Sequence, residues 1–454
     1  MNFLRALLRR AEQIAPAHTT TPVPDDQSVP AYRVAIVCIG VAFTLTGLYM
    51  GSEIGLALGL RGGIRAAIIG SVILAVMSIP AAIVGARTRL STYMIVQSVF
   101  GPGGSRVVNF VLAIVLIGWY AVTAELFGRT CYLTVAQYFP HASIAPQVYT
   151  IACSIVVTAT TVFGFRALDR LSLLVAPLLV ALTVYVAYRA LGHASWSTLE
   201  AVKGTDLDLS RGISAVVGGM VVNVVLMPDL TRYSRTVLDC ALISVTGNGV
   251  ANGGMLVLAM LPALAFSEQD PMKYMAVLSL TSIAFTILVL STWSVNAVNL
   301  YSTGLVTATA FPTAGYGQIV IGTGLAGTAL ALFGFADRFI DFLVFLGLVV
   351  PPIAAVYLTD FFLLGRQELP AEPDAALLNV NGLVACGLGA ATGISLYLAK
   401  VSLSGVPTIE SFVSSAALYW LLEQVRVRCW RNRRWGRLPK TRDCYPSQSR
   451  RRHL

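Results

Sequence analysis

Long apolar runs separated by short polar segments repeat along most of the chain. A membrane-spanning helix needs roughly 20 mainly apolar residues. Twelve runs of about that length occur, at 33–60, 64–86, 106–135, 147–165, 170–190, 211–229, 240–266, 274–304, 315–335, 338–363, 378–400 and 408–425. The runs are continuously apolar rather than alternating, which favours helices, because a helix satisfies its backbone groups within one segment. The pattern predicts an all-α polytopic membrane protein with 12 transmembrane helices.

Composition supports this class. Of the 454 residues, 56% are hydrophobic and 12% charged, whereas about a quarter of the residues in soluble domains are charged. The longest hydrophilic stretches are the two ends. We therefore expect an N-terminal tail over 1–30, one membrane transport domain over 31–425 and a basic C-terminal tail over 426–454.

The net charge of +10 is concentrated at the two ends of the chain. Arginines precede the first run, and RVRCWRNRRWGRLPKTRDCYPSQSRRRHL follows the last. The positive-inside rule places both termini on the cytoplasmic side of a plasma or inner membrane. A basic tail beside a membrane is typical of topology determinants and contacts with anionic lipid. Because no nucleic-acid recognition module accompanies the charge, we expect the partner of the basic tail to be the lipid bilayer and not nucleic acid. We also expect the protein to be a monomer.

Cysteine and histidine patterns argue against an enzyme. The seven cysteines are scattered, odd in number and without a C-x-x-C pair, so they predict neither a disulfide framework nor a zinc site. The four histidines lie in the tails or in predicted external connections. We expect no catalytic centre and no cofactor.

Two of the predicted spans have the composition of interrupted helices. The first, RVAIVCIGVAFTLTGLYMGSEIGLALGLRGG, carries five glycines between residues 40 and 59. The sixth, GISAVVGGMVVNVVLMPDLTRYSR, pairs Gly218 with Gly219 ahead of Asn223 and Pro228. Spans one and six are five apart, as an inverted repeat of five helices with broken first members requires. The alternative is that these glycines only let neighbouring helices pack closely.

Five stretches resemble the nucleobase:cation symporter-1 (purine/cytosine permease) family, in the family's order and spacing. They are TPVPDDQSVPAY, IGWYAVTAELFG, VVGGMVVNVVLMPDLTRYSR, STWSVNAVNLYSTGL and VPPIAAVYLTDFFLLGR. The resemblance implies a leucine-transporter-like fold of twelve helices, with a five-plus-five inverted repeat and broken helices 1 and 6. It also implies import of a nucleobase such as cytosine or a purine, by symport with a proton or a sodium ion.

In the third span, Trp119 can stack on a flat heteroaromatic ring, and the resemblance places a ring-stacking tryptophan here. The alternative, a tryptophan at the lipid interface, fits poorly with a position well inside a span. Thr123 lies one turn on, on the same face. Its hydroxyl has two interpretations, a donor to the substrate or a bond to its own helix backbone.

The eighth and sixth spans supply the other substrate candidates. An asparagine amide is complementary to a nucleobase edge, since it carries both a donor and an acceptor. By resemblance, Ser291 and Asn296 match positions in the cation or substrate region. In the sixth span, Met220 stands where cytosine permeases place an aromatic residue. The set is completed by Gly219, Asn223, which can also pair with a neighbouring helix, and Asn299.

The resemblance also implies a cation site built from carbonyls of the broken first span and hydroxyls of the eighth. Hard cations prefer such oxygen ligands. The matching positions are Gly40, Phe43, Thr44 and Ser294. Sodium-coupled relatives carry a second hydroxyl where this chain has Val295, so proton coupling gains weight over sodium.

Two carboxylates, Glu53 and Glu125, fall within predicted spans. An intramembrane ionisable group is by default a functional hypothesis, so each is a candidate for proton coupling. Arg129, one turn from Glu125, offers that residue an ion pair instead, and Glu53 has the alternative of a wet outer vestibule. The missing second aromatic also leaves another substrate class open, a small heterocycle such as a vitamin B6 or thiamine precursor, allantoin or a hydantoin.

Overall fold

A computed structural model describes residues 22–139, 141, 144–163, 165–205, 207–310, 314–366 and 378–435. Every regular element in these ranges is a helix, which confirms the all-α prediction. Residues 1–21 of the predicted N-terminal tail and 436–454 of the predicted C-terminal tail lie outside these ranges.

The first predicted span is broken. Helix α2 (Ala31–Ala42) ends at Phe43, and α3 (Leu45–Thr88) begins after Thr44. Both intervening residues have extended backbone. Helix α3 continues through the second predicted span and changes direction at Gly59, whose positive φ of 69° suits glycine.

The remaining elements follow the predicted order with shifted boundaries. Predicted span 8 was wrong at its start, because a separate short helix, α12, precedes α13. The elements are η1 (Asp25–Gln27), α4 (Thr92–Tyr138), α5 (Pro146–Phe163), α6 (Phe165–His193), α7 (Trp196–Ala201), α8 (Leu209–Val225), α9 (Met227–Thr231), α10 (Val237–Ser244), η2 (Val245–Ala251), α11 (Asn252–Phe266), α12 (Pro271–Val277), α13 (Thr281–Ala310), α14 (Tyr316–Leu332), η3 (Phe335–Arg338), α15 (Phe339–Val349), α16 (Pro351–Leu358), η4 (Thr359–Leu363), α17 (Val380–Leu398) and α18 (Pro407–Trp435).

Length and composition make several of these helices able to cross a membrane. In the described part of the chain, seven helices are long and apolar enough to do so, and four shorter helices are apolar: Ala31–Ala42, Pro146–Val162, Leu209–Val225 and Tyr316–Leu332. The shorter ones include α2 and α8, the first parts of the broken first and sixth spans. A break thus explains why these two spans lack a single long helix.

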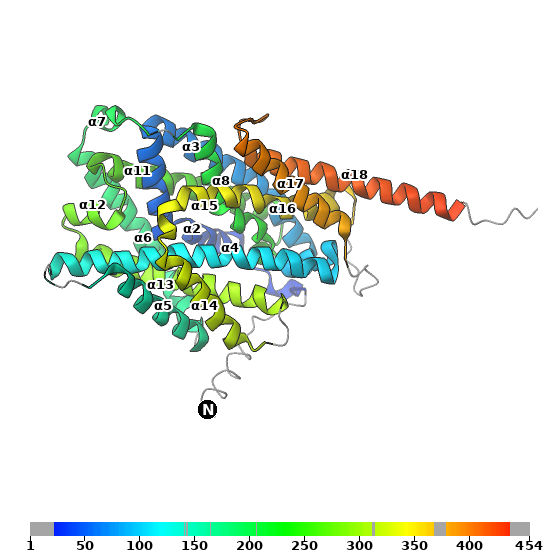
Figure 1. The fold of residues 1–454 in the computed structure, drawn as a ribbon, viewed down its shortest axis with the longest axis horizontal. Coiled ribbons are helices and arrows are strands. Elements are labelled where there is room, and N and C mark those ends of the chain that lie inside the picture. The colour runs from blue at the N-terminus through cyan, green and yellow to red at the C-terminus, as the bar shows by residue number, and fades with distance from the viewer. Residues whose placement is uncertain are drawn as a thin grey trace, which may run out of the picture.

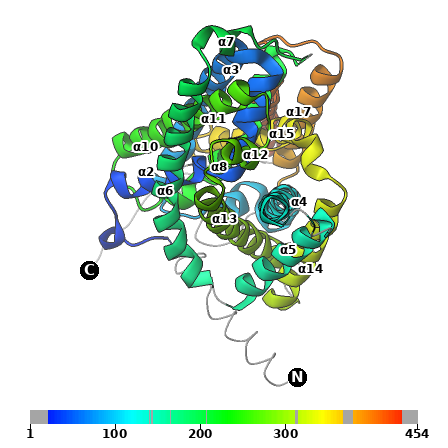
Figure 2. The same cartoon turned by 90° about the vertical axis from the view of Figure 1, so that its left-hand side faces the viewer.

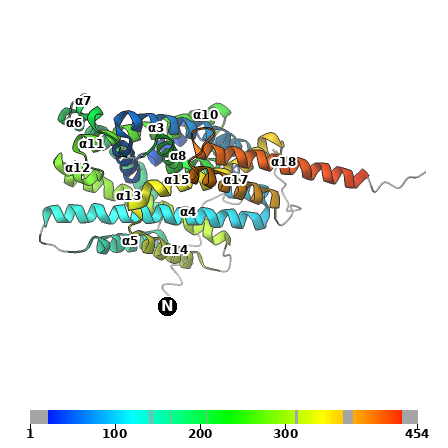
Figure 3. The same ribbon diagram turned by 45° about the horizontal axis from the view of Figure 1, so that its top comes forward.

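The helices pack as two groups with α4 running between them (Figure 1). Seen along its axis, α4 lies beside α13, α5 and α14 (Figure 2), and each of these three helices contacts it. In the other group, α3 packs against α8 and α11, and α15 packs on α8. Figure 3 shows α18 projecting from one end of the molecule.

The paired glycines of the sixth span do not break it. Helix α8 runs straight through Gly218 and Gly219, so for this pair the alternative interpretation, close packing of neighbouring helices, holds. A Cβ on Gly218 would lie 1.6 Å from the Leu343 carbonyl oxygen, so α8 and α15 meet backbone to backbone. The break itself comes after Val225, at Leu226, and α9 follows with Pro228 in its first turn.

Charged residues close both ends of the bundle. Arg211 pairs with Asp341 where α8 and α15 begin, and Asp229 accepts a bond of 2.8 Å from the Thr92 N–H. At the far end of α15 and α16, Asp360, Arg366 and Glu423 form a chain of ion pairs that reaches α18. Helix α18 then continues to Trp435, ten residues beyond the predicted end of the membrane domain at 425.

The α8–α15 contact gives a test of the fold. We expect Gly218→Ala to lower the melting temperature sharply or abolish recovery of monodisperse protein, because the added methyl group overlaps the Leu343 carbonyl. Gly254→Ala is the matched control, since a Cβ there meets no atom within 4 Å, and we expect it to be neutral or stabilising by up to about 1 kcal/mol. Equal thermal unfolding of both variants in detergent would contradict the close contact.

Candidate functional site

Trp119 lies in the middle part of α4, partly buried against the start of α15. Its indole ring packs edge to face on Phe342, with centroids 5.7 Å apart, and on Phe339, at 6.2 Å. Phe339 also contacts Tyr49 of α3 edge to face. Perpendicular rings on two sides fix the plane of the indole, as a stacking platform requires.

One turn further along α4, Thr123 joins α4 to α13. Its hydroxyl donates to Asn296 Oδ1 and lies 2.7 Å from the Trp119 carbonyl oxygen. The contact with the Trp119 carbonyl agrees with the interpretation of a bond to its own helix backbone, and donation from Thr123 to the substrate stays a prediction. Asn296 is fully buried, and its Nδ2 has no hydrogen-bond partner. A free amide donor, held in place through its oxygen, lies next to the tryptophan helix.

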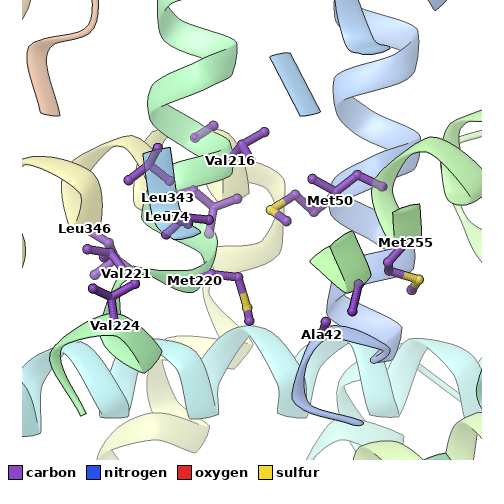
Figure 4. Packing of buried hydrophobic residues seen from close by; sticks show 14 of the residues in the cluster. Ala42, Met50, Leu74, Val216, Met220, Val221, Val224, Met255, Leu343 and Leu346 are labelled. Carbon is purple, nitrogen blue, oxygen red and sulfur yellow. The ribbon is translucent and has the colours of Figure 1, made fainter. Parts of the chain in front are cut away.

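Gly219 and Met220 face α3 and α4 from α8. A Cβ on Gly219 would lie 2.6 Å from the Met50 sulfur, so the missing side chain makes room for that thioether. Figure 4 shows Met50 and Met220 on facing sides of the space between α3 and α8, with the Met220 sulfur directed toward α4. Met220 stands at the position where the family resemblance implies an aromatic ring. The Met50 and Met220 thioethers supply polarisable apolar surface there instead.

Asn223 pairs with a neighbouring helix, the second of the two sequence-based interpretations. Its Nδ2 donates to Asn248 Oδ1 at 2.8 Å. Asn248 lies on η2, a π-helical segment of the seventh span, and is fully buried with Nδ2 unpartnered. Sequence reasoning missed Asn248. The signal was present in TGNGVANGG, where two asparagines stand among glycines within an apolar span.

The other hydroxyl and amide candidates of the eighth span lie along α13. Ser291 and Ser294 are buried, at 6% and 1% exposure. Asn299 is partly exposed, and its backbone carbonyl accepts a bond from Thr303. Among the candidates of α13, Asn296 is hydrogen-bonded to Thr123, a substrate candidate on α4.

The break in the first span places backbone oxygens inside the bundle. Because α2 ends at Ala42, helix geometry leaves carbonyls of its last turn, including Gly40, without an intrahelical donor. The Thr44 side-chain oxygen accepts a bond from the Gly47 N–H and so caps α3. The resemblance implies the Thr44 backbone carbonyl as a cation ligand, and this carbonyl accepts from the Leu48 N–H. Its role as a cation ligand stays a prediction.

Glu125 does not pair with Arg129, so the ion pair expected from sequence was wrong. Glu125 Oε2 accepts a 2.8 Å bond from the Ala336 N–H at the start of the tenth span. Arg129 instead binds Asp270, with Nε and Oδ2 2.7 Å apart. Burial raises the pKa of Asp270 above its usual range, and the Arg129 guanidinium opposes that rise. Both carboxylates thereby tie α4 to neighbouring segments.

Glu53, on α3, differs from Glu125 because one of its carboxylate oxygens has no hydrogen-bond partner. This oxygen, Glu53 Oε2, is buried. Gln269 is a side-chain hydrogen-bond partner of the carboxyl group, and the charges that act on it, Asp341 and Asp337, have the same sign as its own. The described residues supply no cation for this carboxylate, which is costly for a charge in a membrane protein.

A family model described as permease for cytosine/purines, uracil, thiamine and allantoin matches residues 22–421. The chain is 25% identical over 415 residues to the cytosine permease of Escherichia coli O157:H7, covering 90% of this chain and 94% of that protein. It is 24% identical to the cytosine permease of Escherichia coli strain K12, with the same coverage.

Solved structures show the same fold. The inward-facing conformation of Mhp1 superposes with a TM-score of 0.79 at 15% identity, over 90% of this chain and 94% of that one. Mhp1, a nucleobase-cation-symport-1 family transporter, in a closed conformation with bromovinylhydantoin bound, gives 0.74 at 16% identity, over 89% and 94%. A sodium-coupled sialic acid symporter gives 0.57 at 12%, over 92% and 94%.

These matches confirm the leucine-transporter-like fold, with its broken first and sixth spans, for a multi-pass membrane protein that is a transporter and not an enzyme. The chain belongs to the nucleobase:cation symporter-1 family of permeases.

Proposed function

We propose that the protein imports a nucleobase such as cytosine or a purine by cation symport. The observation that carries this proposal is the buried Asn296 amide, which Thr123 holds one helical turn from Trp119. An indole face and an amide together match a flat ring with hydrogen-bonding edges. The curated relatives at 24–25% identity are cytosine permeases, which supports the same substrate class.

In this proposal, each side chain has a separate task. Trp119 stacks on the ring of the substrate. Asn296 Nδ2, which has no partner in the protein, donates to a carbonyl or ring nitrogen of the substrate. Ser291 and Asn299 lie on the same helix as Asn296. Gly219 leaves room for the Met50 sulfur, and the Met50 and Met220 thioethers offer the ring an apolar contact. An unpartnered buried donor costs about 1–3 kcal/mol, and the substrate would supply the missing acceptor.

A second candidate is a different small heterocycle, such as a vitamin B6 or thiamine precursor, allantoin or a hydantoin. The observation that favours it is Met220, a thioether where the family resemblance implies an aromatic ring. Mhp1, which shares the fold, is described with a bound hydantoin. A flexible thioether adapts to ring shapes more readily than a rigid aromatic.

For the coupling ion, we propose a proton carried by Glu53. Val295 removes one hydroxyl from the sodium site that the resemblance implies around Gly40, Phe43, Thr44 and Ser294. Glu125 is engaged with the Ala336 N–H, whereas Glu53 has a buried oxygen without a partner. Protonation neutralises that oxygen and so removes the cost of burying a charge. A cytoplasmic location of both termini and a monomeric state remain predictions from the charge distribution and the family.

Uptake into cells that lack their own nucleobase permeases tests the substrate class. We expect accumulation of at least one of radiolabelled cytosine, adenine, uracil, allantoin and pyridoxine. Trp119→Ala should reduce it to the level of cells without the protein, because the stacking surface is lost. Trp196→Ala is the control, since Trp196 is 53% exposed on α7. If no ring compound accumulates at normal protein abundance, the proposed function is wrong.

The coupling proposal predicts the behaviour of Glu53→Gln. Wild-type uptake should rise as the outside is acidified and fall when a protonophore collapses the gradient. The glutamine variant is permanently neutral, so its uptake should become insensitive to both treatments and no longer concentrate the substrate. Glu125→Gln is the comparison and should keep the pH response. A pH response of Glu53→Gln equal to that of the wild type excludes Glu53 as the proton carrier.

Val295→Thr tests whether the missing hydroxyl at position 295 explains the proposed lack of sodium coupling. Threonine restores the hydroxyl that is missing beside Ser294, so we expect uptake by this variant to gain a dependence on external sodium that the wild type lacks. Val298→Thr, at an exposed position of the same helix, is the control. The measurement is initial uptake with sodium or with choline as the external cation. A wild type that already requires sodium contradicts the proton proposal.

A further inference from the structure

Two buried asparagines in this protein are arranged in the same way. In each, a neighbouring helix donates to the amide oxygen, Thr123 to Asn296 and Asn223 to Asn248. In each, the Nδ2 group is left without a partner, although the residue is 0% exposed. The bond to the oxygen fixes which end of the amide is free. Asn296 belongs to the site already described, whereas Asn248 lies on a span that the site does not otherwise use.

Asn248 lies between the two broken spans. The residue before it, Gly247, approaches α2 so closely that a Cβ would lie 2.5 Å from Cys38 Cβ. Its partner Asn223 is one turn along α8 from Gly219 and Met220, in the direction of the break at Leu226. The segment that carries Asn248 is a π-helix, a form that occurs frequently at functional sites.

The surface of α8 beside Asn248 is accessible within the bundle. Gly219, Val222, Asn223 and Leu226 are each partly exposed, and their spacing of three and four residues places them on one stripe. Asn223, which belongs to this stripe, bonds to the fully buried Asn248, so this part of the stripe faces η2. The stripe leads from the proposed substrate region to the break in the sixth span.

Asn252, four residues further along the same span, shows what a purely structural asparagine looks like here. It is 2% exposed, and its Nδ2 donates to Ser71 Oγ at 3.0 Å. An asparagine that only holds helices together therefore finds an acceptor in the protein. Leaving a buried donor unmet costs free energy in the unliganded protein, and Asn248 retains such a donor.

The free group is a donor, which decides the class of ligand. An amide N–H₂ binds acceptor atoms and repels cations, and the Asn248 oxygen is already occupied by Asn223. We propose that Asn248 is a further substrate-binding residue, whose Nδ2 donates to a carbonyl oxygen or ring nitrogen of the transported heterocycle on its way between α2 and α8. This proposal rests on the proposed function and adds a specificity-determining contact from the seventh span.

Transport kinetics of Asn248→Ala and Asn252→Ala test the proposal on the full-length protein. We expect Asn248→Ala to raise KM about tenfold, the effect of one lost hydrogen bond to the substrate. Its melting temperature should fall, because the bond from Asn223 is lost as well. Asn252→Ala should leave KM unchanged and lower the melting temperature. Asn248→Asp keeps the acceptor for Asn223 while removing the amide donor, so it should weaken uptake in the same direction even if the alanine variant folds poorly.

Substrate analogues separate a direct contact from a structural effect. With cytosine as substrate, 4-aminopyrimidine lacks the carbonyl oxygen and 3-deazacytosine lacks the ring nitrogen acceptor. For the wild type, both should inhibit more weakly than cytosine. In Asn248→Ala, the penalty for one of them should shrink about tenfold, which identifies the acceptor that Asn248 meets. For another transported heterocycle, analogues lacking its carbonyl or ring nitrogen replace these two.

The outcomes distinguish the two proposals. If wild-type protein carries a ring compound but Asn248→Ala and Asn248→Asp keep its KM and both analogue penalties, the Asn248 contact is wrong and the proposed function stands. The same conclusion follows if Asn252→Ala shifts KM equally. If wild-type protein carries none of the ring compounds, the proposed function fails, and the Asn248 proposal fails with it.

Discussion

The need to satisfy backbone polar groups in an apolar medium governs this fold. Water is absent from the bilayer core, so a helix break must either re-form its hydrogen bonds or leave groups for a ligand. The sixth span re-forms them: the Leu226 N–H bonds to Val222, and the Asp229 N–H bonds to Leu226. Pro228, just after the break, has no N–H to satisfy. In the first span the chain is extended over Phe43 and Thr44, and only the α3 side is capped. The two breaks therefore differ in how many backbone groups they leave without a hydrogen bond. Backbone oxygen atoms for a cation would come from the break in the first span.

The same constraint applies to side chains, and here the protein departs from it. Many buried hydroxyls on the described helices bond to the carbonyl of the preceding turn, as Thr130 and Thr134 do on α4. Thr123 bonds to the preceding turn and also contacts Asn296, whose own donor stays unmet. Buried groups without a partner occur both beside the breaks and on peripheral helices, such as Ser154 on α5 and Thr408 on α18. Among the described residues, Asn248 and Asn296 are the two whose buried side-chain amide donor is unmet.

Much of this arrangement could be predicted from sequence. Continuous apolar runs locate the spans, and dense glycine in the first of them marks a real break. The sixth span was predicted to be interrupted, but the role of Gly218 and Gly219 was left open, because paired glycines carry the same local signal whether a helix stops or another backbone packs against it. Only the position of Leu343, distant in sequence, decides between these. Tertiary pairing also explains the failure for Arg129, which has a carboxylate one turn away yet binds Asp270 from another segment. Asn248 could not be singled out from the sequence, because its proposed role depends on its Nδ2 having no partner, which only the folded structure shows.

The contact of Gly218 with Leu343 has a mechanical consequence. Backbone meets backbone there, and a Cβ on Gly347 would in turn lie 2.9 Å from the Ser214 carbonyl oxygen. These two contacts lie one turn apart on α8, at Ser214 and Gly218, so α8 cannot slide along α15 without backbone atoms overlapping. Arg211, about 10 Å from Gly218 along α8, is paired with Asp341, and Asn223, about 8 Å away on the other side, is bonded to Asn248. We therefore expect α8 and α15 to move together when the protein changes conformation.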